Sequence, residues 1–370
     1  MKVLIINETC GIGSHGKICA DIAESFANQG NEVKIAYGRD FFVPEKYKKY
    51  AVKIGNKLNV YWHGLMSRLF DKHGLASKRA TRRFLKWADD YNPDLIWLHN
   101  IHGYYINYQM LFKWIKSKEN IQVKWTLHDC WAFTGHCAHF MYVKCDKWKT
   151  QCSKCPNKHE YPASLLFDNS KKNFLIKKES FSGIKNMKII CPSNWLKTNV
   201  EQSFLKDYEI AVIKNTIDLK SFKKQDNDLR RKLNLNDKFI VLGVASSWSV
   251  KKGLNDFYKL SSKLDNKEYS IVLIGLTKKQ IKKAPKNVIC IERTNSKEEL
   301  ACYYSMANVF VNLTYEDNYP TVNLEAEACG TKVITYDTGG CKETVGNSSF
   351  VIETGNLEAV IQQIYKLNKE

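Results

Sequence analysis

The sequence predicts an α/β protein that contains two Rossmann-like, wound parallel-sheet domains. Short apolar runs rich in β-branched residues alternate with stretches of helical periodicity, as in buried parallel strands joined by crossover helices. The pattern restarts near Phe239. The length of 370 residues also suits two domains of ordinary size. We therefore expect domains over residues 1–218 and 219–370 that face each other across a cleft.

The first domain opens on a strand at residues 3–7, a glycine-bearing loop and a helix that ends at Gly30. A second strand at residues 32–38 completes a βαβ unit, for which a right-handed crossover is expected. Later strands of the same sheet are expected at residues 94–100, 123–129 and 187–193, and this half ends near residues 211–218.

The second domain consists of five apolar runs separated by helix-like stretches. The strands are expected at residues 239–245, 269–276, 287–292, 308–314 and 331–337. The helices are expected at residues 254–264, 296–307 and 320–330. The polar stretch 220–238 precedes them and is the expected hinge. In open sheets of this kind, ligands bind beyond the carboxyl ends of the strands.

The charge of the chain is strongly positive, with 57 Lys and Arg against 38 Asp and Glu, a net charge of +19. Such an excess indicates an anionic partner: nucleic acid, anionic lipid or a phosphate-bearing substrate. No window approaches the roughly 18 consecutive apolar residues that a membrane-spanning helix needs. The N-terminal apolar run is too short for a secretion signal. We therefore expect neither a secreted nor a membrane-spanning protein.

Residues 39–86 concentrate this charge, with 13 Lys or Arg against 3 Asp or Glu. Aromatic and aliphatic side chains are interleaved with them: Tyr61, Trp62, Leu65, Met66, Leu69 and Phe70. Such a segment suits an anionic membrane surface, where each basic residue contributes about 1 kcal/mol. A solvated helix face would carry the same pattern, so both interpretations stay open.

Three glycines, Gly11, Gly13 and Gly16, lie between the first strand and the first helix. At that position backbone N–H groups and the helix dipole favour a bound phosphate. The spacing G-x-G-x-x-G fits the dinucleotide fingerprint, which also expects an acidic residue about 20 positions further on. Glu32 fits that position only loosely, because it lies at the start of the second strand rather than at its end.

The stretch 314–337 is more informative, because a strand there runs into an acidic loop and then a helix. Asp317 in the loop and Glu325 in the helix are eight positions apart. The loop carboxylate can reach a sugar and the helical one a ribose, while the helix N-terminus at Thr321 and Val322 faces a diphosphate. A capped helix with solvated acids is the plain alternative.

These residues resemble the retaining glycosyltransferases of family 4, which have the GT-B fold and use nucleotide-sugar donors. The family signature is E-x7-E followed by an A-x-G-x-P-V-I-like run. Here Asp317 and Glu325 occupy the two acidic positions and CGTKVI follows. The resemblance implies a catalytic role for Asp317 and Glu325. It also implies a set of donor-binding residues: Glu316, Asn318, Thr321, Val322 and Glu325.

A second family feature is an Arg that lies five residues before the Lys of a K-G pair. In the family, both the Arg and the Lys bind the donor phosphates. The run SSWSVKKG keeps Lys252 and Gly253 but has Ser247 at the Arg position. Arg293, in IERTNS, is the candidate replacement for the missing cation.

The likeness extends over the N-terminal half and is closest to a subgroup assigned to bacterial capsule, colanic-acid and other exopolysaccharide assembly. The motifs NETCGIGSHGKICADIAE, LHNIHGYYIN, WTLHDCWAFTGHC and CPSNWLK carry it. It implies that His128 is an active-site histidine close to the donor sugar and that Gly13 belongs to the donor-phosphate loop. It places His99 and His102 on the acceptor side.

Twelve Cys in a chain without a secretion signal indicate reduced thiols. Residues 130–160 form a Cys-rich insertion in the first domain. Four of its thiols are candidate ligands of a structural zinc ion: Cys137, Cys145, Cys152 and Cys155. Their spacing is not that of a standard zinc ribbon, and free thiols are the alternative. Catalysis itself is expected to need no cofactor.

The sequence thus predicts retaining transfer of a sugar from a UDP- or GDP-linked donor to a lipid-linked saccharide in bacterial surface polysaccharide biosynthesis. Residues 1–218 would bind the acceptor and residues 219–370 the donor. The enzyme is expected in the cytoplasm, peripheral to the inner face of an anionic membrane, without a nucleic-acid partner. Two alternatives stay open: a basic nucleic-acid-binding protein with a zinc knuckle, and a nicotinamide-dependent dehydrogenase.

Overall fold

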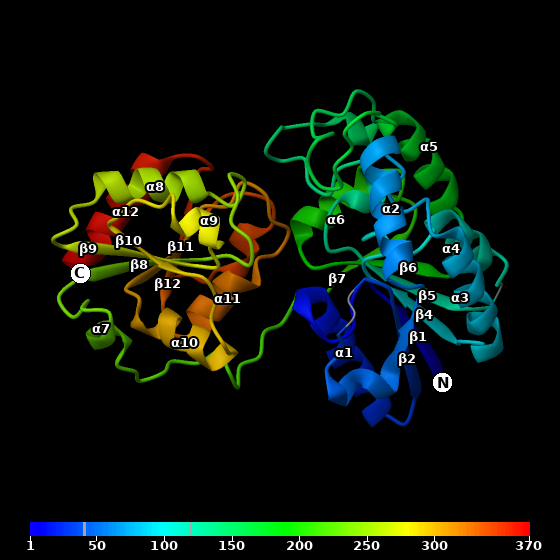
Figure 1. Ribbon diagram of the computed structural model, residues 1–370, viewed down its shortest axis with the longest axis horizontal. Coiled ribbons are helices and arrows are strands. Elements are labelled where there is room, and N and C mark those ends of the chain that lie inside the picture. Colours follow the sequence, from blue (N-terminus) through cyan, green and yellow to red (C-terminus); the bar gives the residue numbers. More distant parts are fainter. Residues whose placement is uncertain (40–41, 119) are drawn as a thin grey trace. The chain divides into compact units, whose positions relative to one another are not determined.

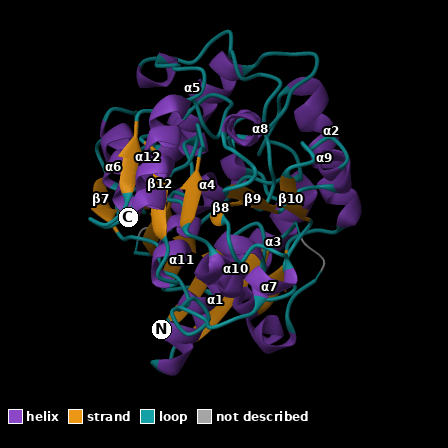
Figure 2. Ribbon diagram, turned by 90° about the vertical axis from the view of Figure 1, so that its left-hand side faces the viewer, coloured by secondary structure: helices purple, strands orange, loops and turns teal. Residues whose placement is uncertain are grey.

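The computed structural model describes residues 1–39, 42–118 and 120–370, which form two compact units, Met1–Ile213 and Lys214–Glu370 (Figure 1). Each unit is built on one all-parallel sheet, drawn in orange in Figure 2, with helices as the connections. The predicted fold class, two wound α/β sheets, is confirmed. Among the helices described, none is both long enough and apolar enough to span a membrane.

The first unit contains a seven-stranded sheet of order β3-β2-β1-β4-β5-β6-β7. Its strands are β1 (Lys2–Ile6), β2 (Glu32–Tyr37), β3 (Ala51–Lys53), β4 (Leu95–Leu98), β5 (Gln122–Thr126), β6 (Met187–Cys191) and β7 (Glu209–Val212). The chain winds from β1 outward to β3, then returns to the other side of β1 with β4. The point where the winding reverses, between β1 and β4, is where ligands bind in open sheets.

Among the residues described in this unit, six α-helices and three 3-10 turns connect these strands. The helices are α1 (Gly13–Asn28), α2 (Lys57–Phe70), α3 (Lys78–Tyr91), α4 (Tyr108–Lys116), α5 (Ser170–Phe181) and α6 (Asn194–Glu201), and the turns are η1 (Glu45–Tyr50), η2 (Trp131–Phe133) and η3 (Lys147–Lys149).

Strand β1 shows why the apolar runs predicted the sheet. Its successive side chains point to opposite faces, so that Val3 and Ile5 join one core cluster while Leu4 and Ile6 join another. All four side chains are fully buried. A strand buried on both faces must be apolar at every position, and the run VLII meets that condition.

The second unit contains a six-stranded sheet of order β10-β9-β8-β11-β12-β13, which reverses its winding between β8 and β11. Its strands are β8 (Phe239–Val244), β9 (Tyr269–Ile274), β10 (Val288–Ile291), β11 (Val309–Asn312), β12 (Lys332–Tyr336) and β13 (Phe350–Ile352). Its helices and turn are α7 (Leu229–Lys232), α8 (Leu254–Lys263), α9 (Lys278–Ile281), α10 (Lys297–Met306), α11 (Thr321–Ala328), α12 (Leu357–Lys369) and η4 (Cys341–Thr344).

The stretch 220–238, which the sequence suggested as a hinge, packs into the second unit instead. Phe222 and Leu235 are buried in its core, and Leu229 of α7 packs against the same cluster. The division between the compact units falls earlier, after Ile213. With Leu233, which also packs there, four apolar side chains of this polar run contact the core of the second unit.

Candidate active site

Two lysine–carboxylate pairs lie at the winding reversal of the second sheet. Lys252 Nζ is 2.7 Å from Asp317 Oδ2 and 3.3 Å from the backbone oxygen of Glu316. Lys251 Nζ is 3.0 Å from Glu316 Oε2. Because β8 and β11 are neighbours, the loops that follow them meet although Lys252 and Asp317 are 65 residues apart. The structure thus brings together three residues that the sequence assigned to the site.

The Lys252 ammonium stays charged in this setting. Burial favours the neutral amine, but the charge of Asp317 and its hydrogen bond outweigh burial and hold the pKa of Lys252 above its ordinary value. The site therefore offers a fixed cation of the kind that stabilises a departing diphosphate.

Gly253 explains why a K-G pair occurs here. It has φ +78° at the N-cap of α8, in the left-handed region that favours glycine. A Cβ at this position would lie only 2.3 Å from the backbone oxygen of Leu313. The glycine therefore lets the Lys252 loop come close to the end of β11.

The helix α11 begins at Thr321, and Pro320 before it provides no side-chain cap. Its first N–H groups, at Thr321 and Val322, are therefore without a side-chain acceptor from the N-cap residue. The same loop buries Asn318. Such a helix start provides donors and positive potential for an anion, as the sequence suggested.

Glu325 has different partners from Asp317. Its Oε2 accepts a hydrogen bond from the hydroxyl of Tyr304 in α10 at 3.1 Å. Burial raises the pKa of Glu325, although the hydrogen bonds from Tyr304 and Thr321 counteract part of this rise. The two acids of the signature are therefore held separately, one by a lysine and one by a tyrosine.

Arg293, the candidate substitute for a second cation, follows the edge strand β10. Its side chain is exposed, and it forms no ion pair within the described chain. Strand β9 separates β10 from β8, so the two backbones are on the order of 10 Å apart. Arg293 could contact an anion bound by Lys252 only from the direction of β10. Its role therefore stays a prediction.

Three histidines meet at the winding reversal of the first sheet. His99 follows β4, His128 follows β5 and His15 lies in the first turn of α1. His99 Nδ1 is 3.0 Å from His128 Nε2, and the ring centroids of His15 and His128 are 4.2 Å apart. Asn100 Nδ2 is 2.7 Å from His15 Nδ1. His15 and Asn100 were not among the predicted site residues, although His15 is part of the glycine-bearing motif.

Burial keeps this histidine pair neutral. It lowers the pKa of His99 to about 3, and it is also the main reason that the pKa of His128 lies well below its ordinary value. A neutral imidazole donates one hydrogen bond and accepts another, and it carries no acidic proton at physiological pH. The pair can therefore orient a hydroxyl group but does not act as a cationic acid.

His102 belongs to a second cluster. Its Nε2 is 3.0 Å from Asp129 Oδ2, and its Nδ1 is 3.2 Å from the hydroxyl of Tyr161. Burial raises the pKa of Asp129, but the charge and hydrogen bond of His102 outweigh it and hold that pKa below its ordinary value. The sequence named His102 but neither of its partners. Asp129 directly follows His128, which was the available signal.

The glycine loop precedes α1 as predicted, and Gly13 has φ +67°, a conformation that favours glycine. The structure does not complete a dinucleotide site around it. Glu32 begins β2 and is exposed at the amino end of that strand, whereas the loop follows the carboxyl end of β1. In a parallel sheet these ends lie at opposite edges, so Glu32 is misplaced for a ribose.

The four candidate zinc ligands line one small cavity of about 10 Å³ together with Phe140 and Trp148. Cys137 and Cys155 hydrogen-bond to each other, and Cys152 Sγ accepts the N–H of Gly135 at 3.2 Å. Within the described ranges, no group of three or more His, Cys, Asp or Glu side chains is arranged to hold a metal ion. The four thiols thus lie around one cavity without an arranged metal group among the described residues, and the zinc site stays a prediction.

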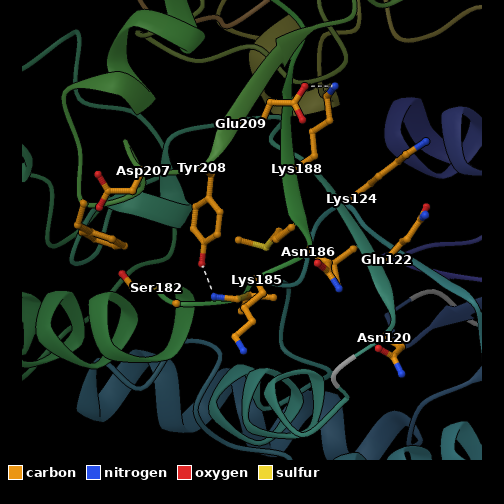
Figure 3. A pocket seen from close by; sticks show the side chains of 15 residues that line it. Asn120, Gln122, Lys124, Ser182, Lys185, Asn186, Lys188, Asp207, Tyr208 and Glu209 are labelled. Carbon is orange, nitrogen blue, oxygen red and sulfur yellow. Dashed lines mark hydrogen bonds and ion pairs between the residues drawn. The ribbon is translucent and has the colours of Figure 1, made fainter.

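A cavity of about 840 Å³ lies at the amino ends of β5, β6 and β7, the edge opposite to the histidines (Figure 3). Lys188 there pairs with Glu209, and the hydroxyl of Tyr208 accepts the N–H of Ile184 at 3.0 Å. Some of its polar side chains are thus already partnered. Ligands in open sheets bind at the other edge. We assign it no part in the site.

Two protein-family models together match nearly the whole chain. The model of "Glycosyltransferase Family 4" matches residues 16–221, more than half of the chain, and "Glycosyl transferases group 1" matches residues 225–370. The putative colanic acid biosynthesis glycosyl transferase WcaC of Escherichia coli (strain K12) is 24% identical over 171 residues, 44% of this chain and 41% of that protein.

A second relative is N,N'-diacetylbacillosaminyl-diphospho-undecaprenol alpha-1,3-N-acetylgalactosaminyltransferase of Campylobacter jejuni. It is 29% identical over 155 residues, 39% of this chain and 40% of that protein. The matched segments thus span less than half the length of either curated relative.

Among solved structures, Anabaena Alr3699/HepE in complex with UDP superposes with a TM-score of 0.64 at 15% identity, over 100% of this chain and 90% of that one. At that identity the match establishes the fold alone. With the family match, the two parallel sheets and the motif order all in agreement, we conclude that this chain belongs to glycosyltransferase family 4 and has the GT-B fold.

Proposed function

We propose that the protein transfers a sugar, with retention, from a nucleoside diphosphate sugar to a lipid-linked saccharide in bacterial surface polysaccharide biosynthesis. The observation that carries this proposal is the pairing of Lys252 with Asp317 at the winding reversal of the second sheet. It fixes one cation and one carboxylate where an open sheet binds its ligand. Residues 219–370 would accordingly bind the donor and residues 1–218 the acceptor.

The donor's diphosphate requires positive potential. Lys252 supplies a fixed charge, and the uncapped start of α11 at Thr321 supplies N–H groups. Arg293 would add a second positive charge. In the first unit, the absence of a side chain at Gly13 would let a phosphate come close to the backbone. The solved relative Alr3699/HepE contains UDP, which supports UDP-sugars as the first donors to test, with GDP-sugars as the second class.

The proposed chemistry breaks the bond between the anomeric carbon and the diphosphate oxygen while the acceptor oxygen bonds to the same face of that carbon. The departing diphosphate takes the acceptor hydroxyl's proton, so no protein nucleophile and no cofactor is needed. Asp317 and Glu325 would then position donor hydroxyls, and the neutral His128 would orient the donor sugar through a hydrogen bond. The main demand on the protein is electrostatic stabilisation of the leaving group.

The acceptor assignment draws on the relatives. The Campylobacter enzyme's name specifies an undecaprenol diphosphate-linked acceptor, and that of WcaC specifies colanic acid biosynthesis. A lipid-linked acceptor would bring this protein to the inner face of the cytoplasmic membrane as a peripheral enzyme. We place His99 and the cluster of His102, Asp129 and Tyr161 on the acceptor side.

The test is a donor screen in which the full chain is incubated with UDP- and GDP-sugars and released nucleotide is counted. We expect slow hydrolysis of one donor that a lipid-linked acceptor accelerates. Lys252→Ala should abolish most of this turnover, while Lys263→Ala, which removes an exposed lysine of α8, should leave it unchanged. Release of neither nucleotide from any donor would reject the proposal.

A further inference from the structure

An apolar surface covers one side of α2 in the first unit. Leu58 is 75% exposed and Tyr61 72%, and Trp62 and Leu65 are exposed beside them. These four positions follow the i, i+3, i+4, i+7 spacing that places side chains on one helix face. The helix therefore presents to solvent a stripe of the kind that usually faces a core.

A second segment extends this surface. Leu165, Leu166 and Phe167 are all exposed. Phe167 stacks on Phe70 with ring centroids 5.8 Å apart, and the N–H of Leu165 donates to the backbone oxygen of Arg68 at 2.6 Å. These contacts fasten the segment to the end of α2. We call the combined surface the docking face: Leu58, Tyr61, Trp62, Leu65, Leu165, Leu166 and Phe167.

A basic cavity of about 640 Å³ adjoins the docking face, between α2, the start of α3 and α5. Trp62 belongs to both, since it also lines the cavity. Four cations line it and no carboxylate does: Lys72, Lys78, Arg79 and Lys172. None of these four forms an ion pair with a described residue.

The position of Lys78 and Arg79 adds to the unbalanced charge. They are the first two residues of α3, whose first turn contains no acid and whose N-cap, Ser77, makes no side-chain capping bond. Cations at a helix N-terminus are repelled by the helix dipole. A bound anion would relieve both this repulsion and the repulsion among the four side chains.

We propose that the docking face binds an anionic phospholipid bilayer, with a lipid phosphate in the basic cavity. The apolar side chains would enter the boundary between headgroups and acyl chains, and the cations would pair with phosphates. A nucleic acid would leave Leu58, Leu165 and Leu166 in water, so the combination of charge and aliphatic surface favours lipid. The inference deepens the membrane association in the proposed function and rests on it for its setting, but vesicle binding can be tested without donor or acceptor.

The experiment is sedimentation of the full chain with vesicles of phosphatidylcholine and phosphatidylglycerol, and with vesicles of phosphatidylcholine alone. The cavity variant is Lys78→Ser, Arg79→Ser and Lys172→Ser together. Its matched control, Lys185→Ser, Lys206→Ser and Lys223→Ser, removes the same charge from exposed lysines outside the face that form no ion pair with described residues. Circular dichroism confirms that both variants fold.

We expect the wild type to bind only the anionic vesicles. The cavity variant should lose about fivefold in affinity per cation, on the order of 100-fold in all, while the control stays within about twofold. A third variant, Leu165→Ser with Leu166→Ser, should also weaken binding at unchanged charge. Equal losses in the cavity and control variants would overturn the proposal, as would wild-type binding to neither vesicle. Donor hydrolysis, measured on the same proteins, reports separately on the proposed function.

Discussion

Lys252 Nζ lies 2.7 Å from Asp317 Oδ2, so the cation that would meet the donor's diphosphate is held by a carboxylate of the neighbouring loop. An ion pair of this kind fixes the lysine's direction but also offsets part of its charge. The two residues should therefore affect binding and turnover differently, which a pair of variants can separate.

We predict that Asp317→Asn lowers kcat by on the order of 100-fold, as expected for loss of a positioned catalytic group. Nucleoside diphosphate affinity should be equal or tighter, because the lysine loses its competing carboxylate. Steady-state kinetics with the best donor and equilibrium titration of the product nucleotide measure the two effects. A loss of nucleotide affinity that equals the loss of kcat would show that Asp317 acts through binding alone.

The second prediction concerns Glu325 and Tyr304. Glu325→Gln should reduce transfer by on the order of 100-fold. Tyr304→Phe removes a hydrogen bond that lowers the pKa of Glu325, so the pKa should rise further above its ordinary value. The carboxylate form would then be lost at a higher pH, and the acid limb of the rate profile should move upward.

The pH profile of kcat/KM for wild type and Tyr304→Phe tests this shift. Tyr303→Phe, which changes the adjacent tyrosine of α10, is the matched control. An unchanged acid limb in Tyr304→Phe would show that the ionisation of Glu325 does not set that limb. A transfer rate of Glu325→Gln within threefold of wild type would show that Glu325 is not a site residue.

A third prediction is that Arg293 replaces the cation absent at Ser247. Arg293→Ala and Lys252→Ala should both weaken nucleoside diphosphate binding, the exposed arginine by the smaller factor because solvent screens its charge. Arg231→Ala, in the exposed helix α7, is the control. If titration calorimetry shows a loss only for Lys252→Ala, the replacement idea is wrong.

The fourth prediction concerns pH and stability through His63. Its Nδ1 is 2.9 Å from Ser77 Oγ, and its Nε2 accepts the N–H of Gly74 at 2.9 Å. Burial lowers its pKa from the usual 6.5 to about 3. Between these values the unfolded chain binds a proton that the folded chain does not, so the free energy of unfolding falls as the pH falls.

Because of this histidine, the free energy of unfolding should fall by about 2 kcal/mol between pH 7 and pH 5. His63→Gln, which cannot take up that proton, should show a pH-dependent loss smaller by about that amount. Urea unfolding of both proteins at the two pH values provides the comparison. Parallel stability curves would mean that His63 is protonated in the folded state.

The sequence could predict those parts of the site that depend on local pattern. Runs such as VLII specify strands buried on both faces, and the residues around Lys252 and Asp317 fall after such strands. It could not predict that these two side chains form an ion pair, because that contact depends on the pairing order of β8 and β11. Nor could it predict the close contact between the His15 and His128 rings, which joins α1 to the end of β5.

The docking face and the cysteines show a different limit. Tyr61, Trp62 and Leu65 have the spacing of a core-facing stripe, and only the fold reveals that the stripe faces outward. Leu165 and Leu166 lie in an irregular segment without periodicity, so no pattern marked them. Asp40 and Phe41 of the basic segment 39–86 lie outside the described residues. The spacing of the cysteines in the sequence does not predict that Cys137 and Cys155 hydrogen-bond to each other.

The most direct test of the account is titration calorimetry of the full chain with UDP and with GDP. We predict that wild type binds one of the two, and that Lys252→Ala weakens this binding by roughly 10- to 100-fold, the scale of a hydrogen bond to a charged group. Lys263→Ala should bind as the wild type does. Binding of neither nucleotide, or equal binding by wild type and Lys252→Ala, would contradict the account.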